Sequence, residues 1–423
     1  MAWHTVRPRW SVALTTLALA AFAVTMVNSG SVYRSLFSRP RPWDKHSLPD
    51  LPPILGRPRS APPVERFRGS VDLPSLASSL DRLRPLSPKN LVSVKMATHA
   101  LRLWGPSAIF DEGPTYSSYN AGRYQFSCPT LLKTLLNDDE FRRMYPNLSP
   151  LLSATTYGVT TRFQVDQFND QPITVWPDCE AHVGKLISVL GEIGIAGDFP
   201  VRADGRDWTV ADLINDSLRR FTSDQEPDFT AKAYLYYLDL PATWHDRFGR
   251  AYDIQDVLRK LVERPRGVGA CLGTHACQVL ALALRIDTDQ TFLSGPMRKS
   301  IRDYLTKTSR LLEGSQTREG TWPWRWFGAE NRVVLQLNEP ERVADIRAMG
   351  HHLEWISIAP PDVCPGDESV RRAVAALQRE MADMPNMGFY EYNFPLTHAA
   401  RGLCLLAGMP AHEIIKDYPP RPE

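Results

Sequence analysis

Two neighbouring helices of different kinds are predicted by the pattern of hydrophobic positions between residues 270 and 326. Residues 277–286 are apolar almost without interruption. The excess of alanine and leucine over β-branched residues there favours a helix that is buried on every side. Residues 297–312 instead place apolar side chains at helical spacing with charged side chains between them, so one side of this helix faces water. An inner helix followed by an outer helix is typical of a two-layer helical ring.

The loop after the second helix carries the motif Gln316-x-x-x-Gly320-x-Trp322, and Trp324 and Trp326 follow it. This motif resembles the repeat of the terpenoid cyclase and protein prenyltransferase superfamily, whose members are α/α toroids. The resemblance implies that the glutamine and the tryptophan tie the end of an outer helix to its neighbour. It therefore predicts an all-α protein that forms an α/α toroid, a ring of inner and outer helices.

The acidic motifs that carry the chemistry of the cyclases, Asp-x-Asp-Asp and Asp-Asp-x-x-Asp, do not occur in the sequence. A partial match to the prenyltransferase zinc motif remains in Asp362, Cys364 and His398. Two interpretations stay open, a metal site or a buried thiol beside a turn aspartate. We assign no metal ligands on this basis, and the sequence names no cofactor.

Helices that begin near a histidine recur along the chain, at irregular spacing, so the repetition is degenerate. The histidines are His182, His275, His352 and His398. Amphipathic patterns over residues 178–193 and 368–381 predict further helices of the same arrangement.

The candidate for acid–base chemistry is the pair His351 and Glu354, which share one helix face. With Gly350 they loosely resemble the Gly-His-x-x-Glu segment of the N-acylglucosamine 2-epimerase family, which is itself an α/α barrel. His275 and His398 could converge with them at one mouth of the ring. The alternative is that each histidine bonds a helix end or a loop. A catalytic site predicts that the four side chains face one cavity, and a scaffold predicts that they are scattered.

Aromatic residues are the candidates for ligand binding, because alternating aromatic side chains form platforms for sugar rings or an apolar lining for a polyprene. The alternative is packing that seals the helix ends. The candidates are Trp322, Trp324, Trp326, Trp355, Tyr390 and Tyr392.

Residues 10–27 carry no charge and follow Arg7 and Arg9, a pattern long enough to cross a bilayer. We expect a retained signal anchor, with the main domain on the extracytoplasmic side; a cleaved signal peptide is the alternative. The high density of proline after this segment predicts an extended linker. The expected organisation is an anchor over residues 1–30, a linker over 31–87, the toroid over 88–410 and a tail over 411–423.

The chain of 423 residues has a net charge of +2, which gives no case for binding nucleic acid. No nucleophile elbow, phosphate-binding loop or dinucleotide fingerprint occurs in it. Three classes of function remain: a membrane-tethered toroid that binds a ligand or a partner, a divergent enzyme, and a structural scaffold. An enzyme would act on a carbohydrate or an isoprenoid in the toroid cavity. The sequence leaves open whether the protein is an enzyme.

Overall fold

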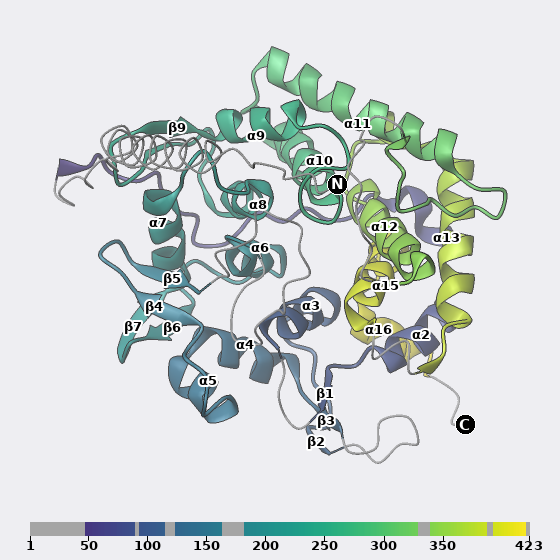
Figure 1. Ribbon diagram of the computed structural model, residues 1–423, viewed down its shortest axis with the longest axis horizontal. Coiled ribbons are helices and arrows are strands. Elements are labelled where there is room, and N and C mark those ends of the chain that lie inside the picture. Colours follow the sequence, from purple (N-terminus) through teal and green to yellow (C-terminus); the bar gives the residue numbers. More distant parts are fainter. Residues whose placement is uncertain are drawn as a thin grey trace, which may run out of the picture. The chain divides into compact units, whose positions relative to one another are not determined.

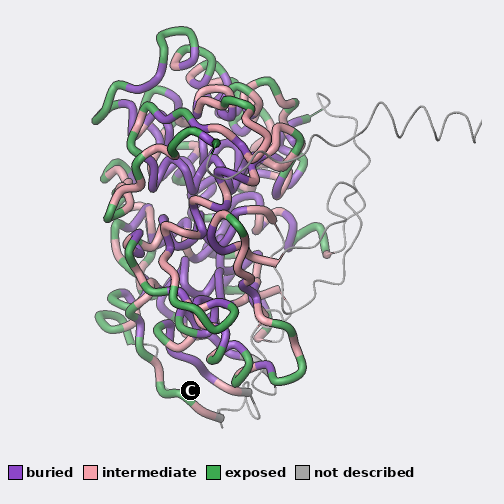
Figure 2. The backbone as a smooth tube through the Cα atoms, turned by 90° about the vertical axis from the view of Figure 1, so that its left-hand side faces the viewer, coloured by how far each residue is buried: buried purple, intermediate pink, exposed green. Residues whose placement is uncertain are grey.

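The computed structural model describes residues 47–88, 93–114, 123–162, 182–328, 339–386 and 392–419. The predicted membrane anchor falls outside these residues. Among the residues described, no helix combines the length and the apolar character needed to cross a membrane. The chain from Leu48 onward forms one unit. In this unit the buried segments run through the middle and the exposed segments lie at the periphery (Figure 2).

Helices account for most of the described chain, which confirms the predicted all-α class. The strands are short and antiparallel. β1 (Leu86–Pro88) and β2 (Gly113–Pro114) both pair with β3 (Arg123–Gln125). Three hairpins are β4 (Leu152–Ala154) with β5 (Val159–Thr161), β6 (Pro200–Ala203) with β7 (Arg206–Thr209), and β8 (Thr243–His245) with β9 (Ala251–Asp253).

Six of the described helices, here called the central helices, bury most or all of their residues. Each packs against the next along the chain, and the last packs against the first, so their contacts close on themselves (Figure 1). Such helices have no polar side to turn to water, and only neighbours on all sides can cover them. They are α3 (Val94–Trp104), α6 (Lys185–Glu192), α8 (Asp228–Tyr237), α10 (Thr274–Asp289), α12 (Glu341–Ile356) and α15 (Asn393–Ala407).

Amphipathic helices cover the outside of the central helices and alternate with them along the chain. In Figure 1, α11 follows the upper edge and α13 the right-hand edge. The inner–outer difference predicted for the helices after residue 270 is confirmed, because α10 is buried almost throughout and α11 only along one side. The surrounding helices are α2 (Leu73–Arg82), α7 (Val210–Arg220), α9 (Ile254–Glu263), α11 (Gly295–Ser315) and α13 (Asp367–Ala382), and the shorter α4 (Cys128–Leu136), α5 (Asp138–Met144) and α16 (Ala411–Asp417) lie between elements.

Gln316 joins the end of α11 to the start of α13. Its side-chain amide donates hydrogen bonds to the carbonyl oxygens of Gly320 at 2.9 Å and Ser369 at 2.8 Å. The hydroxyl of Ser369 donates back to the Gln316 side-chain oxygen at 3.0 Å. Trp322 is fully buried beside this link. The motif thus has a structural role, as the resemblance implies.

The proline-rich segment 48–64, here called the strap, packs on the helices, so the linker predicted for residues 31–87 is wrong from Leu48 onward. The backbone N–H groups of Leu55 and Arg59 donate to the carbonyl oxygens of Tyr237 and Tyr236, at 2.7 and 2.9 Å. The physical reason is that the last carbonyls of a helix have no partner within it, and an extended chain supplies the missing donors. The strap leads into a short 3₁₀ helix, η2 (Glu65–Ser70), and then into α2.

The predicted C-terminal tail over 411–423 also needs correction, because residues 411–417 form α16. Ala411 and Ile414 are buried in the main core. This helix packs against α2 and α3. Two apolar residues three apart are enough to dock one helical turn, a signal too short to recognise by periodicity.

Two glycines allow α12 and α15 to pack backbone against backbone. A Cβ atom on Gly350 would lie 2.5 Å from the backbone nitrogen of Ala399. A Cβ atom on Gly402 would lie 2.9 Å from the carbonyl oxygen of Gly350. Side chains that follow these glycines on the two helices are therefore brought close together.

Candidate functional site

Polar side chains from all the central helices meet within the buried interior of the unit. α3 and α15 contribute arginines, α6 and α12 contribute glutamates, α8 contributes a lysine, and α10 contributes a histidine and a glutamine. Most of these side chains are less than one-tenth exposed. A structural core would place apolar groups in such positions. The residues are His99, Arg102, Glu192, Lys232, His275, Gln278, His351, Glu354, His398 and Arg401.

Glu354 on α12 is the centre of this group. Its Oε1 atom lies 3.2 Å from Arg401 and 3.3 Å from Arg102, and both guanidinium groups pair with it. The same oxygen lies 3.1 Å from Nδ1 of His398. The side-chain amide of Gln278 donates to the other oxygen. Burial raises the pKa of Glu354, but the surrounding cations, Arg102 first, hold it well below its usual range, so the carboxylate is ionised.

Glu192 on α6 forms a second buried carboxylate beside the first. It pairs with Arg102 at 2.8 Å, Lys232 at 2.8 Å and Arg401 at 2.5 Å. Burial lowers the pKa of Lys232 to about 8, although Glu192 opposes the change. Three cationic groups, Arg102, Lys232 and Arg401, thus share two carboxylates. When Lys232 is protonated, below about pH 8, these five side chains have a net charge of +1.

The four side chains predicted for catalysis lie together. The ring centroids of His351 and His398 are 3.7 Å apart, and those of His275 and His351 are 4.6 Å apart. Nδ1 of His275 contacts the side-chain oxygen of Gln278 at 3.2 Å, and Nδ1 of His351 lies 3.4 Å from Glu354. These partners are side chains, so the contacts do not correspond to capping of helix ends. The catalytic role of the four residues stays a prediction.

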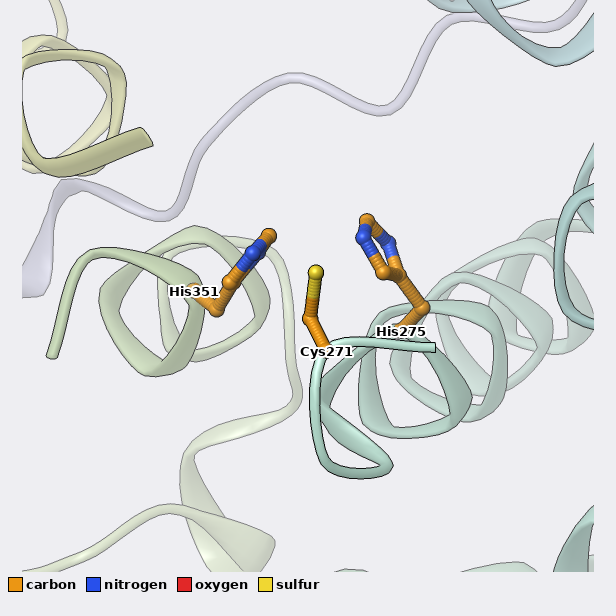
Figure 3. Close-up of side chains that lie close together, drawn as sticks. All are labelled: Cys271, His275 and His351. Carbon is orange, nitrogen blue, oxygen red and sulfur yellow. The ribbon is translucent and has the colours of Figure 1, made fainter. Parts of the chain in front are cut away.

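Cys271, which sequence reasoning passed over, completes this cluster. It lies just before α10, and its side chain points between the rings of His275 and His351 (Figure 3). Cys271 and Leu272 both have positive φ angles, 47° and 59°, in a region that side-chain-bearing residues rarely occupy. Burial raises the pKa of the Cys271 thiol, but the neighbouring His351 lowers it by more, to about 7. The only sequence signal is a cysteine four residues before His275.

Burial also sets the charge of the other histidines. It lowers the pKa of His275 and of His398 well below the usual value, and nearby positive groups act in the same direction. These two rings are therefore neutral near pH 7, the form in which an imidazole binds a metal or accepts a proton. Burial lowers the pKa of His351 too, but Cys271 and Glu354 raise it by more, and the net change is upward.

The tryptophans predicted to bind a ligand pack in the interior instead. Trp322 and Trp326 surround the ring of His352, and Trp355 donates a hydrogen bond to it at 2.9 Å. Trp324 lies in a small separate cluster with two alanines of α12. All four are nearly or fully buried, so the alternative of packing that seals a helix applies to them. Tyr392 is partly buried against the core, and Tyr390 falls outside the described residues.

The three residues of the partial zinc motif are not assembled. Asp362 pairs with Arg302 on the surface. The thiol of Cys364 contacts the carbonyl oxygen of Pro360 at 3.4 Å. His398 instead contacts Glu354 in the interior. Cys364 is thus a partly buried thiol beside the turn that contains Asp362.

A cavity of about 570 Å³ adjoins the charged cluster. Its volume lies within the range of small-molecule binding sites. Residues 58–63 of the strap form part of its wall, and the C-terminal ends of α3, α6 and α15 form another part. The charged residues that line it are Arg59, Arg102, Glu192, Lys232, Glu354 and Arg401. None of the four described tryptophan candidates lines it.

In comparisons with known proteins, the chain matches no protein-family model, no curated protein and no solved structure. The contacts themselves are specific. Arg102, Glu192, Lys232 and Arg401 carry no sequence motif, and Gln278 was visible only as a polar residue in an apolar helix. The distances between side chains of different helices are what define the site.

Proposed function

We propose that the central and surrounding helices form an α/α toroid and that its centre is the site of an enzyme. The closed order of contacts among the central helices supports the ring, and the alternation of buried and amphipathic helices supports its two layers. The Gln316 link between α11 and α13 is the role that the toroid resemblance implies for that residue.

The observation that carries an active centre is the buried, ionised Glu354 with partners from α3, α10 and α15. Removing charged groups from water costs several kcal/mol for each ion, and a core of apolar side chains avoids this cost. Buried titratable groups whose pKa values are shifted by specific partners are concentrated at functional sites. A scaffold predicts scattered histidines, whereas these histidines lie together beside a cavity that Glu354, alone of the four candidates, lines.

The chemistry that fits best is acid–base catalysis by His398, held in place by Glu354. Nδ1 of His398 lies 3.1 Å from Glu354 and 3.5 Å from Arg102, and the shorter contact, to the carboxylate, favours the proton on Nδ1. Nε2 is then a base, and it is buried without a hydrogen-bond partner among the described residues. Glu354 orients the ring and stabilises the imidazolium that forms when the base takes up a proton.

A small, polar, anionic substrate fits the cavity better than an isoprenoid. The cations at the cavity wall favour a carboxylate-bearing ligand. A hydrocarbon chain would leave the same charges without solvent or partners, at high cost. Sugar acids combine the required negative charge with a carbon-bound proton that a base can remove, and neutral acylated sugars, which have the proton but no carboxylate, test whether the charge is needed. We further propose, from the sequence, that residues 10–27 tether this enzyme to a membrane with its main domain on the extracytoplasmic side.

Exchange of carbon-bound hydrogen in D₂O tests this proposal without knowledge of the product. The full chain is incubated with glucuronate, galacturonate, N-acetylglucosamine and N-acetylmannosamine, and the loss of C–H signals is followed by ¹H NMR. We expect exchange in at least one compound. His398→Gln should slow that exchange by about 10²–10⁴-fold, the contribution of a positioned base.

The matched control replaces a surface glutamate. Glu380→Gln changes a residue that pairs with Arg342 on the outside of the unit, and it should leave exchange unchanged. Glu354→Gln should reduce exchange, because the ring of His398 loses its orienting carboxylate. The absence of exchange in all four compounds contradicts an acid–base enzyme for this substrate class. Saturable binding in calorimetry without exchange would favour the second candidate, a binding toroid.

A further inference from the structure

We propose that Cys271, His275 and His351 bind a zinc ion, with a fourth coordination position left open. One donor atom from each residue lies within 4.8 Å of the other two. The three side chains come from the segment before α10, from α10 and from α12, and they point toward one another (Figure 3). This site goes beyond the proposed acid–base function, because zinc binding does not require that His398 act as a base.

The donor set is the first argument. One sulfur and two imidazole nitrogens suit zinc, which takes thiolate and histidine ligands in a tetrahedral arrangement. With bonds of about 2.3 Å to sulfur and about 2.0 Å to nitrogen, tetrahedral donors lie roughly 3.5 Å apart. Donors within 4.8 Å of one another reach that spacing through side-chain shifts of about 1 Å. Three protein ligands with an open position are typical of zinc sites that bind water or substrate.

The arrangement of groups behind the ligands is the second, independent argument. Histidine ligands of metals donate their other ring N–H to a carbonyl or a carboxylate, which fixes the ring. Nδ1 of His275 contacts the side-chain oxygen of Gln278 at 3.2 Å, and Gln278 in turn donates to Glu354. Nδ1 of His351 lies 3.4 Å from Glu354 and 3.4 Å from the side-chain amide nitrogen of Gln278, so both of these polar neighbours lie on the Nδ1 side of the ring.

The other ring nitrogens, Nε2 of His275 and Nε2 of His351, are therefore the ones left for a metal. Nε2 of His351 is buried and has no hydrogen-bond partner within the described part of the chain. A buried polar atom without a partner is costly, and an ion at this position would satisfy it. The left-handed backbone at Cys271 and Leu272, which brings the thiol to the histidines, is a local cost of the kind found at ligand sites.

A neighbouring group, formed by His351, Glu354 and His398, is a weaker choice. Its donor atoms also lie within 4.8 Å of one another. However, Glu354 already pairs with Arg102 and Arg401, and a divalent cation would have to compete with both guanidinium groups. The cluster that contains the thiol has no such cation in direct contact with its donors among the described contacts.

Metal titration of the full chain tests the site. Zinc content is measured by elemental analysis, and Co²⁺ is titrated as a spectroscopic probe, with thiolate charge-transfer and tetrahedral d–d absorption as readouts. We expect one equivalent of either metal in the wild type. Cys271→Ser should abolish the charge-transfer band. Gln278→Ala should keep the band but weaken affinity by about 10–100-fold, as loss of a group behind a ligand does.

Cys364→Ser is the matched control, because it removes the thiol of the competing Asp362–Cys364–His398 motif. It should bind Co²⁺ like the wild type, and loss of the band in this variant would overturn the proposal. If Cys271→Ser fails to fold, alkylation of the wild type replaces it: bound zinc should protect Cys271 from iodoacetamide, located by peptide mass spectrometry. Absence of stoichiometric metal, or a metal that leaves Cys271 fully reactive, also overturns the site. Neither result depends on hydrogen exchange in a sugar, so the two proposals fail separately.

Discussion

Replacing Gly350 by alanine tests the close packing of α12 and α15 on which the site depends. The added Cβ atom would lie 2.5 Å from the backbone nitrogen and 2.7 Å from the Cα atom of Ala399. Ordinary contact begins at about 3.4 Å, so the helices must separate by roughly 0.9 Å, the difference of the two distances. The obstructing atoms belong to a helix backbone and cannot rotate away.

Two opposing terms set the magnitude. Alanine is favoured over glycine in a helix interior by about 1 kcal/mol. Overpacking a buried contact costs about 1–3 kcal/mol, and displacement of backbone belongs at the upper end of that range. We therefore expect Gly350→Ala to lower the free energy of unfolding by about 1–2 kcal/mol. It should also weaken binding at the site, because His351 and His398 lie on the two helices that separate.

The assay is urea unfolding of the full chain, and the matched control is Gly314→Ala. Gly314 lies in α11, and a Cβ atom there meets nothing within 4 Å. Only the helix preference remains, so this variant should be stabilised by about 0.5–1 kcal/mol. The reasoning is refuted if Gly350→Ala is as stable as the wild type, or if both variants change stability in the same direction.

Two further predictions concern the frame around the site. Gln316→Ala removes two hydrogen bonds between the end of α11 and α13 and a third to the loop residue Gly320. We expect it to lower the free energy of unfolding by about 1–3 kcal/mol in urea, and a loss below about 0.5 kcal/mol would contradict the structural role of the motif. Burial raises the pKa of Asp345 to about 6, with Glu341 and Glu380 adding to the effect, although the backbone N–H of Trp324 opposes it. The pKa of Asp345 is therefore higher in the folded state than the value of about 3.9 in the unfolded state. Protonated Asp345 makes its full contribution to stability below about pH 4, and this contribution is lost as pH rises through 6. Asp345→Asn should therefore stabilise the protein at pH 7.5 by about 1 kcal/mol, discounted for partial exposure, and have little effect at pH 4; equal effects at both pH values would count against this.

Local patterns in the sequence were sufficient for much of the fold. The uninterrupted apolar run in α10 and the striped pattern of α11 specify which helix is buried, because each helix carries its own periodicity. The linking role of Gln316 was expected from the resemblance that its motif carries. The proposal that His275, His351, Glu354 and His398 face one another followed from their places at related positions of buried helices.

What the sequence could not supply are contacts between segments far apart in the chain. Arg102 and Glu192 are unremarkable charged residues in sequence, and only the packing of α3 against α6 and α15 pairs Arg102 with both Glu192 and Glu354. The strap has the composition of a linker, yet its N–H groups satisfy helix ends. The tryptophans have the composition of a ligand platform, yet they pack in the interior against side chains of α12.

The sequence by itself determined the helical class, the inner and outer character of individual helices and the identity of several polar residues buried among apolar ones. Only the tertiary structure decided which of those residues meet. Whether Cys271 points at two histidines depends on a left-handed turn before α10 and on the distance between α10 and α12. The physical reason is that periodicity and propensity act within a few residues, whereas a site is defined by ångström-scale distances between helices. Those distances are set by the packing of every helix against its neighbours.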